Sequence, residues 1–299
     1  MTISGRATSA LVGTAIAVFL GVSACGGGSA APSAAGSAAP LHAVLPAKIR
    51  SAGHIVLGSE LTVPPMTFRK PGNAAITGVN YDLAQAMGKQ LGVTMKFKQL
   101  AFPGLQPALK SGQIDAIFDV INDTKQRERQ LTFVDYVKSG NTLLLKDGNP
   151  DKVHSMADLC GHTVATVRGS VQIALVTKQS SQCTSAGRTK VRVQQYPSAE
   201  SARLQVQNGK ATAFIGNTPV LVYLAKTAKN GKAFDAVPIK AAQTSYYGIA
   251  LARSDTQLRS ALTQALAAVM KQGTYSTILR RYGVQVVAMD KPLVDAAAG

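Results

Sequence analysis

The stretch DVINDTKQRERQLTF, residues 119–133, gathers unlike polar side chains directly after the apolar segment QIDAIF. Within nine positions, Asp119, Asn122 and Arg127 offer a carboxylate, an amide and a guanidinium. Together these groups can donate and accept hydrogen bonds and can pair with ions of either sign. In open α/β sheets, ligands bind at the carboxyl ends of the strands. The stretch is therefore a candidate binding site for a small polar molecule.

A second polar turn has the same sequence context. The segment VQNGKATAFIGN, residues 206–217, repeats the order found in LKSGQIDAIFDV, residues 109–120. Both read as a helix end, a glycine at the helix stop, a short apolar strand and then polar residues. Two copies of this order predict two similar lobes, each presenting a polar turn at the end of a strand. Gly216 and Asn217 are then the counterpart of the first cluster.

Strand-like and helix-like segments alternate from residue 54 onward, which predicts an α/β fold with mostly parallel sheets flanked by helices. Residues 81–92 show the spacing of an amphipathic helix that ends at Gly92. A long helix is expected to begin after Ser254, with Gln257 at capping-box spacing, and to end at Gly273.

Two extended segments, residues 139–146 and 244–253, are expected to cross between the lobes and to serve as a hinge. The expected first lobe comprises residues 45–141 and 244–299, the latter beginning with the returning hinge strand, and the second lobe comprises residues 142–243. A body of this kind can close on a small molecule held in the cleft between its lobes.

The first 25 residues have the features of a secretion signal. Arg6 precedes about 13 apolar residues, and the small residues of VSAC lead to Cys25. VSAC resembles the lipobox of bacterial lipoproteins, whose cysteine is acylated. An ordinary cleaved signal with a chance cysteine is the alternative. Residues 26–44 begin with a segment rich in Gly, Ser, Ala and Pro, which predicts a flexible linker.

Cys160 and Cys183 are the two cysteines that follow Cys25. In an oxidising exported setting such a pair predicts a disulfide, with two buried free thiols as the alternative. The formal net charge is +17, but the basic residues are mostly isolated and the chain has no Trp. This pattern argues against a nucleic-acid partner and favours a solvated surface that is attracted to anionic lipid or wall polymer.

No familiar catalytic pattern is present. The four histidines are far apart in sequence, and the chain has no G-x-S-x-G, phosphate-binding loop or dinucleotide fingerprint. We therefore expect no enzyme activity, no metal and no cofactor.

Several motifs in order resemble one known family. GSELTVPPMTF, GVNYDLAQAMGKQLG, FPGLQPALKSGQIDAI, TKQRERQLTFVDY, DLCGHTVATVRGS and GNTPVLVYL together resemble the extracytoplasmic solute-binding proteins of ABC importers for polar amino acids, family 3. The resemblance implies a type II periplasmic-binding fold and capture of a polar or charged amino acid, or a derivative, by lobe closure. It also implies a monomer that delivers its ligand to a membrane permease, here anchored by lipid to the outer face of the bacterial cell membrane.

The resemblance also implies site residues. Arg127 matches the arginine that holds the ligand's α-carboxylate, and Asn122 matches a Ser or Thr that touches the ligand. Backbone N–H groups near Ser170, Val171 and Gln172 would meet the carboxylate at a helix start, and Phe102 matches an aromatic residue that packs on the ligand. Read alone, Arg127 is a solvated arginine, Phe102 a core residue, and VRGSVQIAL an ordinary turn into a helix. Thr124 would be the N-cap of the next short helix.

The chain departs from the family pattern at three positions. Asn217 replaces the usual acid that pairs with the α-ammonium, Val63 replaces an aromatic residue, and Asp119 replaces a small residue near Glu60. We expect Glu60 and Asp119 to take over the cationic end of the ligand. The alternative is that Asp119 is a solvated turn acid and that Asn217 simply precedes the helix starting at Thr218.

An exported enzyme on the same fold is the main rival interpretation. Dehydratases of the cyclohexadienyl type resemble these binding proteins and use acids in the cleft. Glu60 or Asp119 could do such work if its pKa were raised. An adhesin or sensor would need a binding surface outside the cleft, for which the sequence offers no candidate.

Overall fold

The computed structural model of the chain describes residues 39–70, 72–240 and 245–297. The expected signal segment 1–25, with Cys25, and the first part of the expected linker lie outside these residues. The described residues belong to one unit by their internal contacts. Among the described helices, none has the combination of length and hydropathy that a membrane span requires.

The first lobe is built on a six-stranded sheet. Its strands, in spatial order, are β14 (Leu293–Val294), β7 (Leu131–Ser139), β13 (Ser245–Ala252), β6 (Ala116–Ile117), β1 (His54–Ser59) and β5 (Thr94–Gln99). Strand β1 is parallel to β5 and β6, whereas β13 is antiparallel to β6 and β7. The alternation of strands and helices expected from the sequence is confirmed. The expected mostly parallel pairing is wrong for this sheet, because β13 and β14 pair antiparallel with their neighbours and the sheet is mixed.

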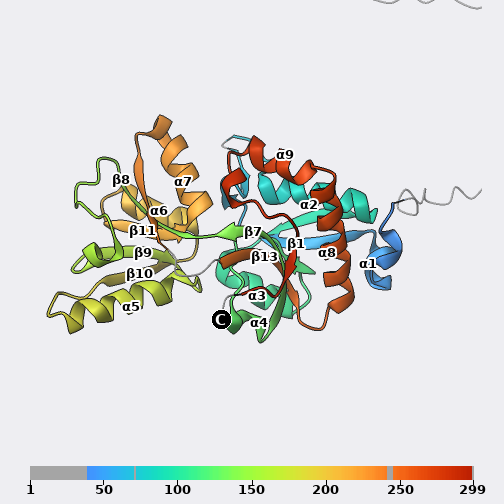
Figure 1. Cartoon of the computed structure of the whole chain (residues 1–299), viewed down its shortest axis with the longest axis horizontal. Coiled ribbons are helices and arrows are strands. Elements are labelled where there is room, and N and C mark those ends of the chain that lie inside the picture. Colours follow the sequence, from blue (N-terminus) through green and yellow to red (C-terminus); the bar gives the residue numbers. More distant parts are fainter. Residues whose placement is uncertain (1–38, 71, 241–244, 298–299) are drawn as a thin grey trace, which may run out of the picture. The chain divides into compact units, whose positions relative to one another are not determined.

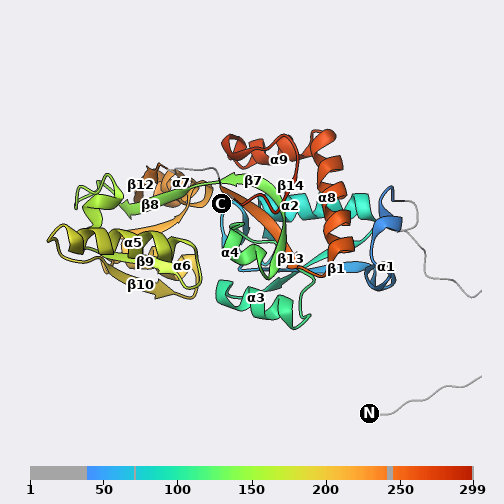
Figure 2. The same cartoon turned by 60° about the horizontal axis from the view of Figure 1, so that its bottom comes forward.

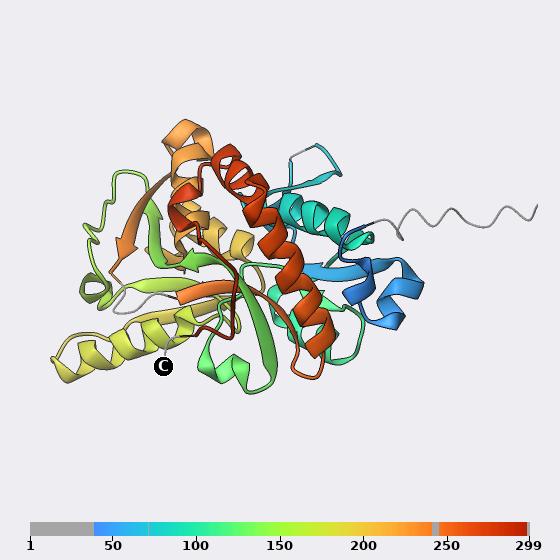
Figure 3. The same ribbon diagram turned by 45° about the vertical axis from the view of Figure 1, so that its right-hand side comes forward.

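Both faces of this sheet are covered by helices (Figures 1 and 2). One face packs against α2 (Val79–Leu91), α8 (Thr256–Lys271) and α9 (Thr274–Arg281), and Figure 3 shows α8 lying across this side. The other face packs against α3 (Phe102–Lys110). Neighbouring strand residues take opposite sides: Phe133 lies in the α3 core, and Val134 lies in the α2 and α8 core.

The second lobe is built on a five-stranded sheet. Its strands, in spatial order, are β10 (Arg192–Tyr196), β9 (Thr163–Val167), β11 (Ala213–Asn217), β8 (Asn141–Lys146) and β12 (Phe234–Ile239). One face is covered by α5 (Gln172–Ser185), and the other by α6 (Ala199–Gln207) and α7 (Thr218–Thr227). Leu143 and Leu145 face the α5 core, whereas Leu144 faces the opposite one.

The two crossings of the chain lie at strand ends. Strand β7 belongs to the first sheet and the next strand, β8, to the second, so the outward crossing occurs at Gly140. Strand β13 begins at Ser245 and belongs wholly to the first sheet, and residue 244 of the expected second crossing lies outside the described residues. The expected crossing segments 139–146 and 244–253 therefore contain strands of one sheet or the other.

Short elements complete the chain. They are η1 (His42–Val44), α1 (Ala47–Ala52), β2 (Thr62–Val63), β3 (Thr67–Arg69), β4 (Ile76–Thr77), α4 (Lys125–Glu128), η2 (Met156–Leu159), η3 (Ala228–Gly231) and η4 (Gln285–Val287). The last part of the expected linker 26–44 contacts the body, because the N–H of Leu41 donates to the carbonyl of Gln90 at 3.0 Å.

The expected N-cap of α8 is wrong by one residue, and the expected end of α2 is confirmed. Asp255, not Ser254, precedes α8, and no side chain caps that helix start. The side chain of Gln257 does not close a capping box, because its Nε2 donates to the carbonyl of Leu45 at 3.3 Å. Gly92 ends α2 with φ at 65°, a left-handed conformation that favours glycine.

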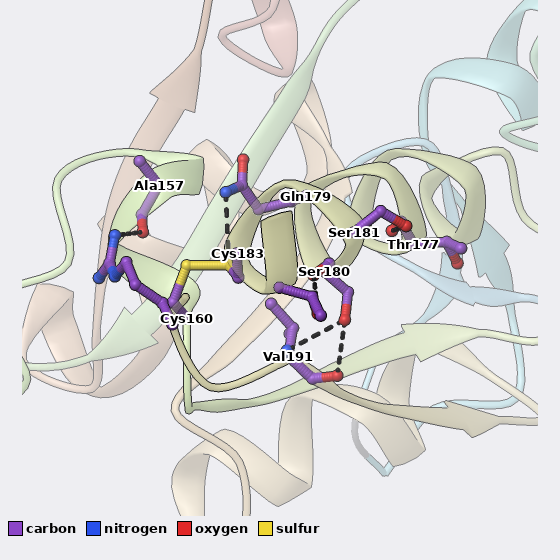
Figure 4. Close-up of a disulfide and its surroundings, with 10 residues drawn as sticks. Ala157, Cys160, Thr177, Gln179, Ser180, Ser181, Cys183 and Val191 are labelled. Atoms are coloured by element: carbon purple, nitrogen blue, oxygen red, sulfur yellow. Dashed lines mark hydrogen bonds between the residues drawn. A yellow bond between two sulfur atoms is a disulfide. The ribbon is translucent and has the colours of Figure 1, made fainter. Parts of the chain in front are cut away.

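The expected disulfide between Cys160 and Cys183 is confirmed (Figure 4). It joins the residue after η2 to α5, with 5.6 Å between the Cα atoms. The hydroxyl of Ser180 bonds both the N–H and the carbonyl of Val191, which fixes the same helix to the chain before β10. A bridge that closes a loop of this length contributes about 3 kcal/mol to stability. Helix α5 is thereby held against its own lobe.

Candidate functional site

Five of the residues expected from the sequence line one pocket. Glu60 and Phe102 come from the first lobe, and Ser170, Gln172 and Asn217 come from the second. Glu60 directly follows β1, Asn217 is the last residue of β11, and the other three come a few residues after the end of a strand. The pocket has a volume of about 40 Å³ and most of its other lining residues are apolar. In this conformation it has room for only a few water molecules.

A larger hollow adjoins this pocket. Its volume is about 1000 Å³, and its lining includes Arg127, Gly169 and Val171. Phe102 and Ser170 line both cavities, so the two are adjacent at these side chains. We refer to the two cavities together as the cleft. Seven of the nine expected ligand-binding residues line it.

Arg127 reaches from the first lobe to the second. The hydroxyl of Thr124 accepts a hydrogen bond from the N–H of Arg127 at 3.2 Å, which confirms Thr124 as the N-cap of α4. The guanidinium donates to the carbonyl of Asn122 through Nη1 at 2.7 Å and to the carbonyl of Gly169 through Nη2 at 3.1 Å. It lies over the ring of Phe102, 5.8 Å from the centroid. Three contacts therefore hold the guanidinium of the half-buried Arg127 in place.

The guanidinium stays charged at neutral pH. Burial lowers the pKa of Arg127 to about 10, and the nearby Asp123 carboxyl opposes this change. The guanidinium makes two bonds to neutral carbonyls, and it can exchange the bond to Gly169 of the second lobe for a stronger one to a carboxylate.

Helix α5 begins beside this guanidinium. Val171 precedes the helix and no side chain caps its first turn. The expected contribution of Ser170 needs correction, because its N–H donates to the carbonyl of Val167 at 3.1 Å. Its hydroxyl lies 3.1 Å from that of Thr166. The N–H groups of Val171 and Gln172 are then the better donors for an anion at this helix start.

Glu60 is buried at the wall of the pocket. Only 5% of the residue is exposed, and Oε1 has no hydrogen-bond partner among the described residues. Burial, and next the carboxyl of Asp119, raise the pKa of Glu60 to about 9, while hydrogen bonds from the backbones of Ala199 and Phe102 oppose the rise. Glu60 therefore holds a proton at pH 7 until a cation approaches it.

Asp119 and Asn122 lie behind the wall of the cleft. The carboxylate of Asp119 is fully buried and accepts from the N–H groups of Glu60 and Val120, both at 2.6 Å. The hydroxyl of Ser59 also donates to it at 3.1 Å. These donors hold Asp119 to the backbone, so the expectation that it contacts the ligand is not supported by its position. Asn122 is buried and positions Arg127 through its backbone carbonyl.

These features occur on a sequence that matches a known family. Residues 55–285 match the model for bacterial extracellular solute-binding proteins, family 3. The chain belongs to this family. Its two lobes have the type II periplasmic-binding fold expected from the resemblance. Members of this family act outside the cytoplasm.

Three relatives of this solute-binding protein are informative. It is 29% identical over 231 residues to the ABC transporter arginine-binding protein 1 of Escherichia coli (strain K12), covering 76% of this chain and 90% of that protein. A solved ancestral arginine-binding protein bound to arginine is 29% identical, with a TM-score of 0.69 and coverage of 77% and 98%. An ancestral amino acid-binding protein described as a precursor of cyclohexadienyl dehydratase is 26% identical, with a TM-score of 0.66 and coverage of 79% and 97%.

A row of three amides in the second lobe of this solute-binding protein was not anticipated. The Nε2 group of Gln172 donates to Oδ1 of Asn141 and to Oδ1 of Asn217, both at 2.9 Å. Asn217 also contacts the first lobe, where its Nδ2 lies 3.5 Å from the carbonyl of Val120. Asn141 and Asn217 are paired across β8 and β11. Only the strand register brings them together, and sequence spacing carries no signal of it.

A group of carboxyls lies in the first lobe behind Arg127. The pKa of Asp123 is raised to about 8. Burial is the largest cause, followed by the charges of Asp135, Glu128 and Asp295. Burial likewise raises the pKa of Asp135 to about 7. With its proton, Asp123 can donate a hydrogen bond within this group, and the group then carries less negative charge.

These carboxyls predict that stability falls as the pH rises. The unfolded chain ionises Asp123 above about pH 4, whereas the folded protein retains the proton up to about pH 8. The contribution of Asp123 to the free energy of unfolding therefore decreases progressively as the pH rises from about 4 to about 8. We expect Asp123→Asn to raise it by about 1 to 3 kcal/mol at pH 7.5 and to change it little at pH 4. Urea unfolding at both values measures this, with the exposed Asp151→Asn as the control. Equal effects of Asp123→Asn at both pH values would contradict the assignment.

Proposed function

We propose that this protein is the substrate-binding subunit of an ABC importer, which captures a polar or charged amino acid or a derivative and delivers it to a membrane permease. The observation that carries the proposal is the bond from Arg127 in the first lobe to the carbonyl of Gly169, just before the start of α5 in the second lobe. A carboxylate at this point would be held by a guanidinium from one lobe and by backbone N–H groups from the other.

Because each lobe supplies part of the carboxylate site, ligand binding favours closure of the lobes. Without a ligand, Arg127 contacts the carbonyl of Gly169 and Asn217 contacts the carbonyl of Val120, and neither of these contacts pairs opposite charges. A carboxylate that bridges Arg127 and α5 adds interactions to the closed form alone. Because a ligand shifts a conformational equilibrium only by its differential affinity, such a bridge favours closure. The permease would then recognise the closed form.

The remaining parts of the site suit an amino acid derivative. Phe102 offers an apolar face next to Arg127, and Glu60 offers a carboxyl that can ionise beside a cation. A zwitterionic or cationic amino acid, or an N-substituted relative, would match these groups. Relatives named for arginine binding agree with a carboxylate at one end of the ligand and a cation at the other.

A thermal-shift screen tests the proposal. Purified protein is heated with each of the twenty amino acids, with their Nα-acetyl derivatives and with matched amines that lack the carboxyl group. We expect stabilisation by a subset of the carboxylates and none by the amines. Absence of a shift with every carboxylate, or equal shifts with the amines, would contradict the proposed function.

The enzyme interpretation makes a different prediction in the same screen. The proton held by Glu60 beside the pocket could serve as a general acid, as in a dehydratase. A binding subunit returns its ligand unchanged, whereas a cyclohexadienyl-type dehydratase eliminates carbon dioxide and water from a hydroxycyclohexadiene carboxylate, and one such compound is included in the screen for this purpose. Mass spectrometry of the ligand after incubation separates the two, and turnover would contradict a binding role.

We also propose that the protein is a monomer anchored by a lipid on Cys25. The VSAC stretch supports this proposal, together with the extracytoplasmic family. Mass spectrometry of protein extracted from membranes should give a first residue of Cys25 that carries acyl chains. An unmodified first residue elsewhere in the chain would contradict the anchor, and a dimer in light scattering would contradict the monomer.

A further inference from the structure

The two lobes contribute different chemistry to the pocket. Among the described residues that line it, Glu60 of the first lobe is the only ionisable side chain. The second lobe supplies the hydroxyl of Ser170 and the amides of Gln172 and Asn217. Its other lining groups are apolar side chains and backbone atoms. The ligand group that faces the second lobe therefore meets no countercharge there.

The amide row fixes which atom of Asn217 can meet the ligand. Gln172 is 2% exposed and uses both protons of its Nε2 group, one for Asn141 and one for Asn217. Each receiving atom is an amide oxygen, so the bond from Gln172 holds Oδ1 of Asn217 toward its own lobe and occupies one of its two lone pairs. The Nδ2 group of Asn217 points instead toward the first lobe, 3.5 Å from the carbonyl of Val120. Asn217 thus presents a hydrogen-bond donor to the cleft.

A donor at this position discriminates between substituents next to the carboxylate. An ammonium group has three donors and no acceptor, so it cannot accept from Nδ2 and finds no negative charge on this wall. An ammonium on this wall would meet only neutral acceptors, and burying it without a countercharge costs several kcal/mol. A carbonyl or hydroxyl oxygen, in contrast, can accept from Nδ2 in place of the carbonyl of Val120.

We propose that the second lobe selects carboxylates whose α-substituent is a hydrogen-bond acceptor, such as an N-acylated amino acid or a 2-hydroxy acid, over those with a free α-ammonium. The proposal rests on the proposed function, because it takes Arg127 as the carboxylate site. Asn217 is the residue that sets the preference, and Gln172 and Asn141 orient it. Glu60 remains available for a cation at the far end of such a ligand.

Isothermal titration with matched ligands tests this preference. The panel pairs each L-amino acid that the screen covers with its Nα-acetyl derivative and its 2-hydroxy analogue. We expect the best acceptor-bearing compound to bind at least tenfold more tightly than the parent amino acid. A free amino acid that binds as tightly as its acceptor-bearing counterparts would overturn the inference.

Two variants make the test specific. Asn217→Asp places acceptors on both atoms and adds a negative charge, so it should reverse the preference by at least a hundredfold in the ratio of affinities. Gln172→Glu removes the donor that holds Oδ1, so it should also shift the preference toward the free amino acid. Asn208→Asp adds the same charge at an exposed position of the second lobe and should change nothing. An unchanged preference in Asn217→Asp would overturn the inference.

The outcomes separate this inference from the proposed function. If free amino acids bind best and the binding depends on Arg127, the importer role stands and the inference fails. If no carboxylate of the panel binds, both fail. If acceptor-bearing carboxylates bind best and Asn217→Asp reverses the order, both are supported.

Discussion

Replacing Arg127 with alanine is expected to weaken the binding of every carboxylate ligand by at least a hundredfold. The guanidinium is held in place by the Asn122 carbonyl and by the ring of Phe102, so it does not need to be ordered again when the ligand arrives. Truncation of one partner in a buried, charged hydrogen bond costs about 2 to 5 kcal/mol. Titration calorimetry measures the loss, and the melting temperature without ligand shows whether the variant is folded.

Arg129 provides the matched control for this prediction. It lies two residues further along, is exposed at the end of α4, and has the same charge. Arg129→Ala should bind as the natural protein does. Arg127→Lys should retain only part of the affinity, because an ammonium cannot form two parallel bonds to a carboxylate. Binding that survives in Arg127→Ala, or is lost in Arg129→Ala, would contradict the assigned role.

A ligand with a cationic end should release close to one proton when it binds at pH 7. Glu60 is protonated in the free protein, since its pKa is raised to about 9, chiefly by burial. A cation next to Oε1 favours the ionised form, and the proton then leaves to the solvent. Affinity should therefore rise with pH, by up to tenfold per unit, and level off above about pH 9. Titrations in buffers with different ionisation enthalpies measure the released proton.

Glu60→Gln isolates this effect. Glutamine keeps the shape of the protonated acid but cannot ionise, so binding of the cationic ligand should weaken and its dependence on pH should disappear. A carboxylate ligand with an uncharged side chain should release no proton from either protein. Proton release that persists in Glu60→Gln would show that another group ionises.

Much of the fold could be predicted from local sequence signals. The alternation of strands and helices, the stop at Gly92 and the pairing of Cys160 with Cys183 depend on periodicity, glycine and cysteine content. The position of Arg127 beside the cleft followed from the resemblance and from its spacing to Thr124, which caps the short helix as expected. Each of these predictions used either a signal within a few neighbouring residues or the order of several motifs along the chain.

The details of the site depended on contacts that no local signal carries. Asp119 appeared available for a ligand, but three donors from Ser59, Glu60 and Val120 hold it. The orientation of Asn217 depends on Gln172, a residue from another helix start, which also bonds Asn141. Such contacts arise from strand register and from the approach of one element to another. Sequence spacing does not show how many hydrogen-bond donors a buried carboxylate will have.

A crystal structure of the protein with the tightest carboxylate ligand of the screen tests the central claim most directly. We predict that the ligand's carboxylate lies between the two lobes, accepts two hydrogen bonds from the guanidinium of Arg127, and accepts others from the N–H groups of Val171 and Gln172. Arg127 should then have left the carbonyl of Gly169. A bound ligand whose carboxylate lies elsewhere, with the bond from Arg127 to Gly169 intact, would contradict the account.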